Sequence, residues 1–246
     1  YLRSKVIENA ELWEEHANLD FVFVESGPAE IRISFTMDNG SWSFFGTDSA
    51  KQSYVKAGNG KTFVRDASGA SMNFGWFNEK TPDHEFRRTT LHEFGHAIGL
   101  AHEHQNANRT VEWNEEAVYA FFAKQGWPRE RTFTQVLKRY GDDTEVSNGV
   151  YDPLSIMHYY YPPELIKGGG QTRQNTTLSN LDIRNVGEMY PFDETTTVVR
   201  PPTTKPNAPK PAPKPITGPA FAFTDVSVDF DGYDEKTEQE GMTFSS

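Results

Sequence analysis

The sequence predicts an α+β domain, because its apolar residues follow helical spacing in some segments and strand patterns in others. Residues 6–17 carry apolar side chains at three- and four-residue intervals, which places them on one face of a helix. Segments 21–24, 31–37 and 71–77 are short runs with β-branched or aromatic residues, and apolar side chains alternate in the last of them. We therefore expect an opening helix followed by three strands.

Helices are predicted in the rest of the folded region by apolar segments and by capping residues. The segment 90–100 is apolar enough for a short helix. Asn114 is placed to cap a second helix, and Pro128 is typical of a helix start. Ser179 can cap a last helix, which we expect to end near Tyr190 because a proline follows.

Three regions of the chain differ in composition. Residues 1–193 have the patterns of a folded domain, whereas eight of the fifteen prolines fall within 198–219. We predict an extended linker over 194–219, because proline lacks the backbone N–H that helices and inner strands require. The acidic tail 220–246 is too short to bury a core of its own. It is disordered, a fragment of a second domain or a strand that docks elsewhere, and the linker is also compatible with a further domain beyond it.

Composition and charge exclude several classes of protein. The 246 residues include no cysteine, so a disulfide scaffold, a thiolate zinc site and a cysteine nucleophile are excluded. The net charge is −11, which argues against a nucleic-acid partner because such a partner requires a basic face. No apolar run approaches the roughly 18 residues of a membrane span. We expect a monomer.

One histidine-rich segment carries the functional signal. From His92 the sequence reads HEFGHAIGLAHEH, so His92 and His96 are four residues apart and lie on one face of a helix. Gly99 lets the helix end with a positive φ, and the returning chain can bring His102 to the same ion. Glu93 follows the first histidine, so its carboxylate is expected beside that ion.

Three neutral imidazoles with an open fourth position are typical of a catalytic zinc site and not of a closed structural one. Zinc lowers the pKa of a bound water to about 7, and Glu93 is placed to accept the proton that this water releases. The metal also polarises a carbonyl oxygen. The predicted reaction is therefore hydrolysis of peptide bonds.

A second element lies downstream, in the segment YDPLSIMHYYY that begins at Tyr151. Taken alone, its Met157 and Tyr159 are ordinary core residues. Together with the upstream HExxHxxGxxH motif, this methionine turn resembles that of a metzincin metallopeptidase, and among metzincins it most resembles the astacin-like group. Two details select that group: Glu103 directly follows the third histidine, and residues 155–159 read SIMHY.

The resemblance implies a metzincin-like catalytic domain with a twisted, mostly parallel five-stranded mixed sheet. An active-site helix and a smaller, irregular C-terminal subdomain complete it, with the cleft between the two parts. It also implies that His92, His96 and His102 bind one catalytic zinc ion and that Glu93 is the general base.

The resemblance assigns further roles around the metal. Met157 would form a hydrophobic floor, and Tyr159 would be a distant fifth ligand that swings away to hydrogen-bond the oxyanion. For Glu103 two roles stay open, a tie to a processed N-terminus or a local salt bridge. An extended substrate would pair with an edge strand formed by Met72, Asn73, Phe74, Gly75 and Trp76.

We predict a zinc-dependent metalloendopeptidase that acts on proteins or peptides. The alternatives are a catalytically silent zinc-containing binding module and a zinc hydrolase that acts on small substrates. Because such enzymes are commonly secreted, we expect an extracellular protein whose signal peptide and any pro-segment are not in this chain.

Overall fold

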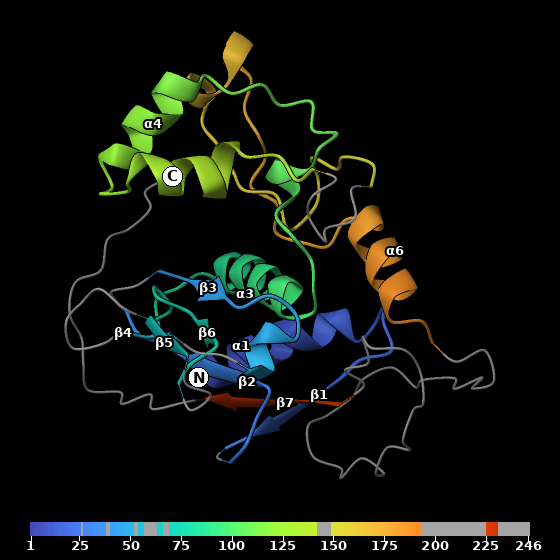
Figure 1. Cartoon of the computed structure of the whole chain (residues 1–246). Helices are drawn as coiled ribbons and strands as arrows, with labels where there is room; N and C mark the ends of the chain where they lie inside the picture. Colours follow the sequence, from blue (N-terminus) through green and yellow to red (C-terminus); the bar gives the residue numbers. More distant parts are fainter. Residues whose placement is uncertain are drawn as a thin grey trace.

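Two parts of different construction face each other in the computed structural model (Figure 1). The sheet and the helices α1 (Leu2–Ala10) and α3 (Asp83–Ala97) form the lower part in this view, and helix α4 (Glu115–Ala123) belongs to the upper part. The structure describes residues 1–25, 27–37, 40–51, 54–56, 63–65, 69–141, 149–192 and 225–230.

The lower part contains a five-stranded mixed sheet, as predicted. Its strand order is β1 (Asp20–Val24), β7 (Asp225–Phe230), β2 (Ile31–Ser34), β6 (Met72–Asn73) and β3 (Trp42–Ser43). The first four strands run parallel, and β3 is antiparallel to β6. The number and mixed character of the strands thus agree with the expected fold, although one strand comes from the C-terminal tail.

A short helix and a hairpin follow β3 along the chain. Helix α2 spans Asp48–Lys51, and the antiparallel strands β4 (Tyr54–Lys56) and β5 (Phe63–Arg65) form a separate two-stranded sheet. These elements were not anticipated, because their sequences show little of the apolar alternation that marks a half-buried strand.

The larger hydrophobic core lies where α1 and α3 pack together and against the sheet. The helical turn η1 (Glu11–Trp13) continues α1, and the indole of Trp13 donates a hydrogen bond of 3.1 Å to the carbonyl oxygen of Leu91 on α3. Helix α3 begins seven residues before the predicted segment 90–100, because its first two turns are mostly polar and a single apolar residue, Phe86, shows no helical periodicity. Packing against α1 compensates for that polarity.

The upper part has a small core of its own, as expected for an irregular C-terminal subdomain. It is built from short elements, and its buried residues are Trp113, Val118, Phe122, Val136, Leu137, Tyr161 and Leu165. The upper part begins with the turn η2 (Glu103–Gln105), and α4 follows it. The later elements are α5 (Arg129–Thr132), the π-helical turn η3 (Phe133–Leu137), η4 (Pro163–Leu165) and η5 (Lys167–Gly169).

Helix α6 (Asn180–Met189) closes the folded region, and its start was predicted correctly. The Ser179 hydroxyl accepts from the Asp182 N–H, and the Asp182 carboxylate accepts from the Ser179 N–H, each over 2.9 Å. This reciprocal pair is a capping box, which satisfies two helix-end donors at once. The helix ends at Met189, one residue before Tyr190.

The prediction of an edge strand over 72–76 is wrong. Strand β6 includes only Met72 and Asn73 of this segment and lies inside the sheet, between β2 and β3. The chain turns at Gly75, where an added Cβ would clash with the carbonyl oxygen of Gly40. That close approach ends the strand, and β3 forms the edge on this side of the sheet.

The tail contributes a strand. Residues 225–230 of the tail 220–246 form strand β7, which pairs with β1 and β2, and the three alternatives for the tail stay predictions. The predicted linker 194–219 lies outside the described residues. No helix among the described residues is long and apolar enough to cross a membrane.

Candidate metal centre and active-site cleft

The first two candidate ligands lie one turn apart on α3, and a sharp turn delivers the third. Gly99 has a φ of 100°, a conformation that favours glycine. The N–H of Gly99 bonds to the carbonyl of His96, and the N–H of Leu100 bonds to that of Gly95. The helix therefore ends as predicted, and the chain returns to place His102 beside the other two histidines.

The three imidazoles converge on one point. One ring nitrogen from each of His92, His96 and His102 lies within 4.8 Å of those of the other two. The Nε2 atoms of His96 and His102 are 3.0 Å apart. The Nε2 atom of His92 is buried and has no hydrogen-bond partner in the described part of the chain. Such a set of aimed nitrogens fits a tetrahedral zinc site with one open position.

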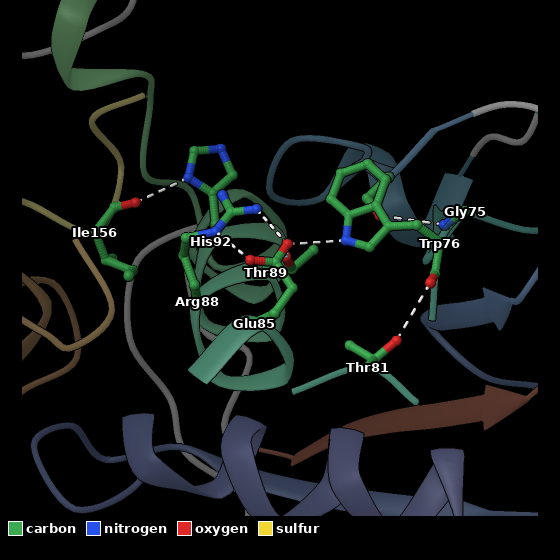
Figure 2. Close-up of polar contacts among 9 residues, drawn as sticks. Gly75, Trp76, Thr81, Glu85, Arg88, Thr89, His92 and Ile156 are labelled. Carbon is green, nitrogen blue, oxygen red and sulfur yellow. Dashed lines mark hydrogen bonds and ion pairs between the residues drawn. The ribbon is translucent and has the colours of Figure 1, made fainter. Parts of the chain in front are cut away.

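Backbone carbonyls fix the orientation of two of these rings. The Nδ1 atom of His92 is 2.9 Å from the carbonyl oxygen of Ile156, and that of His96 is 2.8 Å from the carbonyl oxygen of Leu100. Nδ1 must donate to a carbonyl oxygen, so Nε2 keeps its lone pair free for a metal. Figure 2 shows the bond between His92 and Ile156.

Burial keeps the three histidines neutral. It lowers the pKa of His96 to about 4 and holds those of His92 and His102 well below their usual range, and neighbouring imidazoles add to the effect for these two. Only the neutral ring can ligate a metal. The ligand set is therefore ready at neutral pH without losing protons.

Glu93 lies directly beside the first ligand on α3. Its side chain is buried, and its Oε2 atom has no hydrogen-bond partner among the described residues. Burial raises the pKa of Glu93 to about 8, and the positive charge of Arg88 opposes this shift. A carboxylate with a pKa near the working pH suits a general base.

Met157 packs beneath the active-site helix, and Gly95 makes room for it. Met157 is 2% exposed, and its sulfur would lie 2.5 Å from a Cβ added at Gly95. No role for Gly95 was predicted from the sequence. Its signal is a glycine inside a helix, which costs about 1 kcal/mol relative to alanine and therefore needs a reason.

We expect Gly95→Ala to destabilise the protein by about 1 kcal/mol, because overpacking costs about 1–3 kcal/mol and the gain in helix propensity offsets only part of it. Denaturant unfolding of the single and double variants with Met157→Ala measures the coupling. The alanine should be tolerated better once the Met157 side chain is shortened. An equal effect of Gly95→Ala in both backgrounds would contradict this contact.

Tyr159 lies against the ligands from the side of the methionine turn. Its hydroxyl is 3.0 Å from the Nε2 atom of His102, and its ring stacks on His92 with 4.8 Å between centroids. The buried ring of His104 stacks on it at 5.1 Å. Burial raises the pKa of Tyr159 well above its usual range, so the hydroxyl keeps its proton and can donate it in a hydrogen bond.

Glu103 makes hydrogen bonds to neighbouring residues of the site, and its two expected roles stay predictions. Its Oε1 atom accepts a hydrogen bond of 2.7 Å from the Asp152 N–H and one of 3.0 Å from the Asn106 side chain. Among the described residues Glu103 therefore connects the third-ligand segment to the start of the methionine turn.

A second carboxylate holds the turn itself, and sequence reasoning missed this role. The Oδ2 atom of Asp182 accepts from the Ile156 N–H at 2.8 Å, and its Oδ1 atom accepts from the Ser155 hydroxyl at 2.6 Å. The carbonyl of the same Ile156 orients His92. The first turn of α6 is thus linked to a zinc ligand through one residue.

The segment before α3 is tied to that helix by a polar cluster. Glu85 accepts a hydrogen bond of 2.9 Å from the indole of Trp76 and is paired with Arg88, one turn before His92 (Figure 2). Trp76, predicted as part of a substrate-binding edge, instead anchors the start of the active-site helix.

A cavity of about 350 Å³ opens beside the candidate ligands, between the two parts of the molecule. Ser43 of β3 and Phe45 line it from the lower part, and His96 and His102 lie in its wall. Its other lining residues come from the upper part: Gln105, Thr134, Gln135, Lys138 and Tyr140. The edge of the sheet and the metal site therefore border the same cleft.

Comparisons with known proteins agree with this geometry. The Matrixin family of peptidases matches residues 2–112. Two structures of myroilysin are each 36% identical to this chain over 78% of its length. The match includes 88% of the chain of the first structure, with a TM-score of 0.69, and 79% of the chain of the second, with a TM-score of 0.56. Protein SpAN of Strongylocentrotus purpuratus is 27% identical over 212 residues, which are 78% of this chain. The chain spans only 29% of the length of SpAN.

Three observations lead to one assignment. The three histidines converge from a helix and the chain that returns from it, the methionine turn lies beneath them, and the chain resembles myroilysin over most of both chains. The chain belongs to the metzincins, a family of zinc metallopeptidases.

Proposed function

We propose that this protein is an astacin-like zinc endopeptidase in which Glu93 is the general base. The observation that carries the proposal is the convergence of three neutral imidazoles next to a buried carboxylate, in the wall of a cleft bordered by a sheet edge. When bound by His92, His96 and His102, zinc lowers the pKa of a water to about 7 and polarises a carbonyl oxygen.

Glu93 accepts the proton of the attacking water and delivers it to the leaving amine. Its carboxylate makes no hydrogen bond through Oε2 among the described residues, so this atom is free to receive the proton. Burial favours the protonated form that must then act as an acid. One group can therefore serve in both steps.

Tyr159 donates its hydroxyl proton in a hydrogen bond to the oxyanion that forms at the scissile carbonyl. Burial raises the pKa of Tyr159, which favours the protonated form that can donate. Stacking on His92 and His104 holds the ring beside the candidate metal ligands. A preorganised donor of this kind is worth more in the transition state than in the ground state.

The substrate is an extended stretch of a protein or peptide. It lies along β3, the sheet edge on the side of the cleft, and pairs with that strand through its backbone. An edge strand with an open cleft accepts internal segments of a chain, which favours an endopeptidase over an enzyme that trims ends or acts on small substrates.

The assignment to the astacin-like group rests on residues of the site. Glu103 directly follows the third ligand, and the turn over 155–159 reads SIMHY. An extracellular location fits this group, and the absence of cysteine means that packing, not disulfides, holds the scaffold.

Metal analysis combined with proteolysis tests the proposal. We expect one zinc per chain by elemental analysis and cleavage of denatured casein that stops with a chelator and returns with zinc. Mass spectrometry of the products should show internal cuts. Bound zinc without any turnover would instead indicate a binding module, and cuts only at chain ends would indicate an exopeptidase.

Tyr159→Phe should lower kcat on the order of 10²-fold and leave KM nearly unchanged, because the hydroxyl acts mainly in the transition state. Steady-state kinetics on a fluorogenic peptide measures both constants. Tyr160→Phe is the matched control, because Tyr160 is adjacent in sequence but 45% exposed. A rise in KM with kcat unchanged would show that the hydroxyl binds the ground state and the transition state equally.

A further inference from the structure

One aromatic side chain is open to solvent inside the cleft, next to a candidate metal ligand. Phe45 follows β3 and lines the cavity of about 350 Å³, and it is 45% exposed. Its ring centroid is 6.5 Å from that of His96, the second candidate ligand. Phe74 and Phe94, which also belong to the lower part, are by contrast fully buried. An apolar side chain that is open in a concave wall beside a reaction centre is typical of a ligand-binding cleft.

The backbone on both sides of Phe45 is fixed to the rest of the lower part, where β3 lies beside α3 (Figure 1). The N–H of Gly46 donates a hydrogen bond of 2.9 Å to the carbonyl oxygen of His96, and the N–H of Phe44 donates one of 2.9 Å to that of Ser71. Gly46 has a φ of 51°, so the chain turns immediately after Phe45. The backbone of Phe45 is therefore held at a constant place relative to the candidate ligands.

The lining residues from the upper part are polar and are fixed to the segment that carries the third candidate ligand. The amide of Gln105 donates hydrogen bonds of 2.8 and 3.1 Å to the carbonyl oxygens of Thr134 and Lys138. The N–H of Tyr140 donates one of 2.8 Å to the carbonyl oxygen of Gln105. A side chain that enters the cavity therefore meets Phe45 on one wall and amide, hydroxyl and ammonium groups on the other.

The size of each interaction decides which substrate side chain this cavity favours. An acidic side chain would pair with Lys138, but this lysine is exposed, and an exposed ion pair changes a binding constant by less than about fivefold. An aromatic side chain would cover the open face of Phe45, and burying and stacking a ring changes a binding constant by more than about tenfold. The cavity volume of about 350 Å³ is sufficient for one such ring. The balance therefore favours an aromatic side chain.

We propose that Phe45 is a specificity-determining residue, which stacks on an aromatic side chain of the substrate on one side of the scissile bond. This inference rests on the proposed function, in which the substrate is an extended chain paired along β3. His96 and His102 line the cavity, whereas Glu93 and Tyr159 do not, so the cavity lies to one side of the reacting carbonyl. The preference for an aromatic residue is therefore confined to one side of the cut.

Matched peptides test this preference. Cut sites in denatured casein, mapped by mass spectrometry, should carry an aromatic residue at one position on a fixed side of the cut. Fluorogenic peptides that differ only at that position, with phenylalanine, alanine or glutamate, then give a kcat/KM value for each residue. We expect the phenylalanine peptide to be cleaved at least about 10-fold better than the alanine peptide, and this ratio to fall below about 3-fold in Phe45→Ala.

Two control variants should keep the full ratio. Phe45→Trp preserves an aromatic face in the cleft. Phe192→Ala removes a side chain that is 50% exposed but lies outside the lining of the cavity. Thermal unfolding of Phe45→Ala should match that of the wild type, because substitutions at exposed positions change stability little. A lost preference in a normally folded variant then reports on the cleft and not on the fold.

Peptide binding separates this inference from the proposed function. The phenylalanine peptide should bind to Glu93→Gln at least about 10-fold more tightly than the alanine peptide, as measured by fluorescence anisotropy. That preference without any turnover by the wild type would refute the peptidase and support the aromatic subsite. Equal binding and cleavage of the two peptides, or a preference that Phe45→Ala leaves unchanged, would overturn the inference. A preference for the glutamate peptide that Lys138→Met abolishes would also overturn it, because it would assign the cavity to acidic side chains.

Discussion

Replacing Glu93 with glutamine is expected to lower kcat/KM by about 10²–10⁴-fold while the protein keeps its zinc. Glutamine has nearly the same shape and preserves packing on α3, but it cannot accept the proton of the attacking water. The three histidines are unaffected, because their orientation depends on backbone carbonyls and on the return at Gly99. The variant should therefore lose activity and keep its metal.

The pH profile identifies the same group. A general base works when it is unprotonated, so activity should rise with pH through the pKa of Glu93. Burial raises that pKa to about 8 in the protein alone, and a cation at the three imidazoles favours the carboxylate, so the acidic limb should lie below pH 8. The residual activity of Glu93→Gln should lack this limb.

Glu79→Gln changes an exposed glutamate just before α3 and should leave kcat/KM unchanged. If Glu93→Gln retained full activity with zinc bound, another group would have to be the base. If it lost zinc, the carboxylate would contribute to metal binding.

The metal site could be predicted closely from the sequence, because helical spacing and a glycine return determine it. His92 and His96 share a face by periodicity alone, and the positive φ of Gly99 follows from the residue type. The cap of α6 at Ser179 could also be predicted, because it depends only on neighbouring residues. A serine three residues before an acidic residue can satisfy the free N–H groups at the start of its own helix.

The parts that could not be predicted depend on contacts between distant segments. Apolar side chains alternate over 71–77 as in a strand, yet β6 includes only Met72 and Asn73, and β3 pairs on its outer side, a pairing that has no local signature. The same is true of β7, since a six-residue strand within an acidic tail does not indicate which sheet it joins. The roles of Gly95 and Asp182 depend on contacts with distant residues. Gly95 lies against Met157, and Asp182 accepts a hydrogen bond from the Ile156 N–H.

Asp182→Ala is expected to lower the free energy of unfolding by about 2–4 kcal/mol and zinc affinity by about 10–100-fold. The carboxylate accepts from the Ile156 N–H, the Ser155 hydroxyl and the Ser179 N–H. Alanine leaves these donors without an acceptor and removes half of the capping box of α6. Since the Ile156 carbonyl orients His92, a shift of this turn reaches the metal.

Asp182→Asn separates hydrogen bonding from charge. Both backbone donors bond to Oδ2, and an asparagine carbonyl in that place preserves both bonds, while its amide faces the Ser155 oxygen. Burial raises the pKa of Asp182, so the charge itself is held at a cost that asparagine avoids. Asparagine should therefore restore most of the stability and zinc affinity that alanine loses.

Denaturant unfolding of the metal-free protein and zinc competition with a chelator measure the two effects separately. Glu188→Ala on the same helix is the control, because its 3.7 Å pair with Arg184 is exposed and contributes little. If Asp182→Ala lowered stability but left zinc affinity unchanged, the carboxylate would serve only the cap of α6. If asparagine were as damaging as alanine, the negative charge would be what holds the methionine turn beneath the metal.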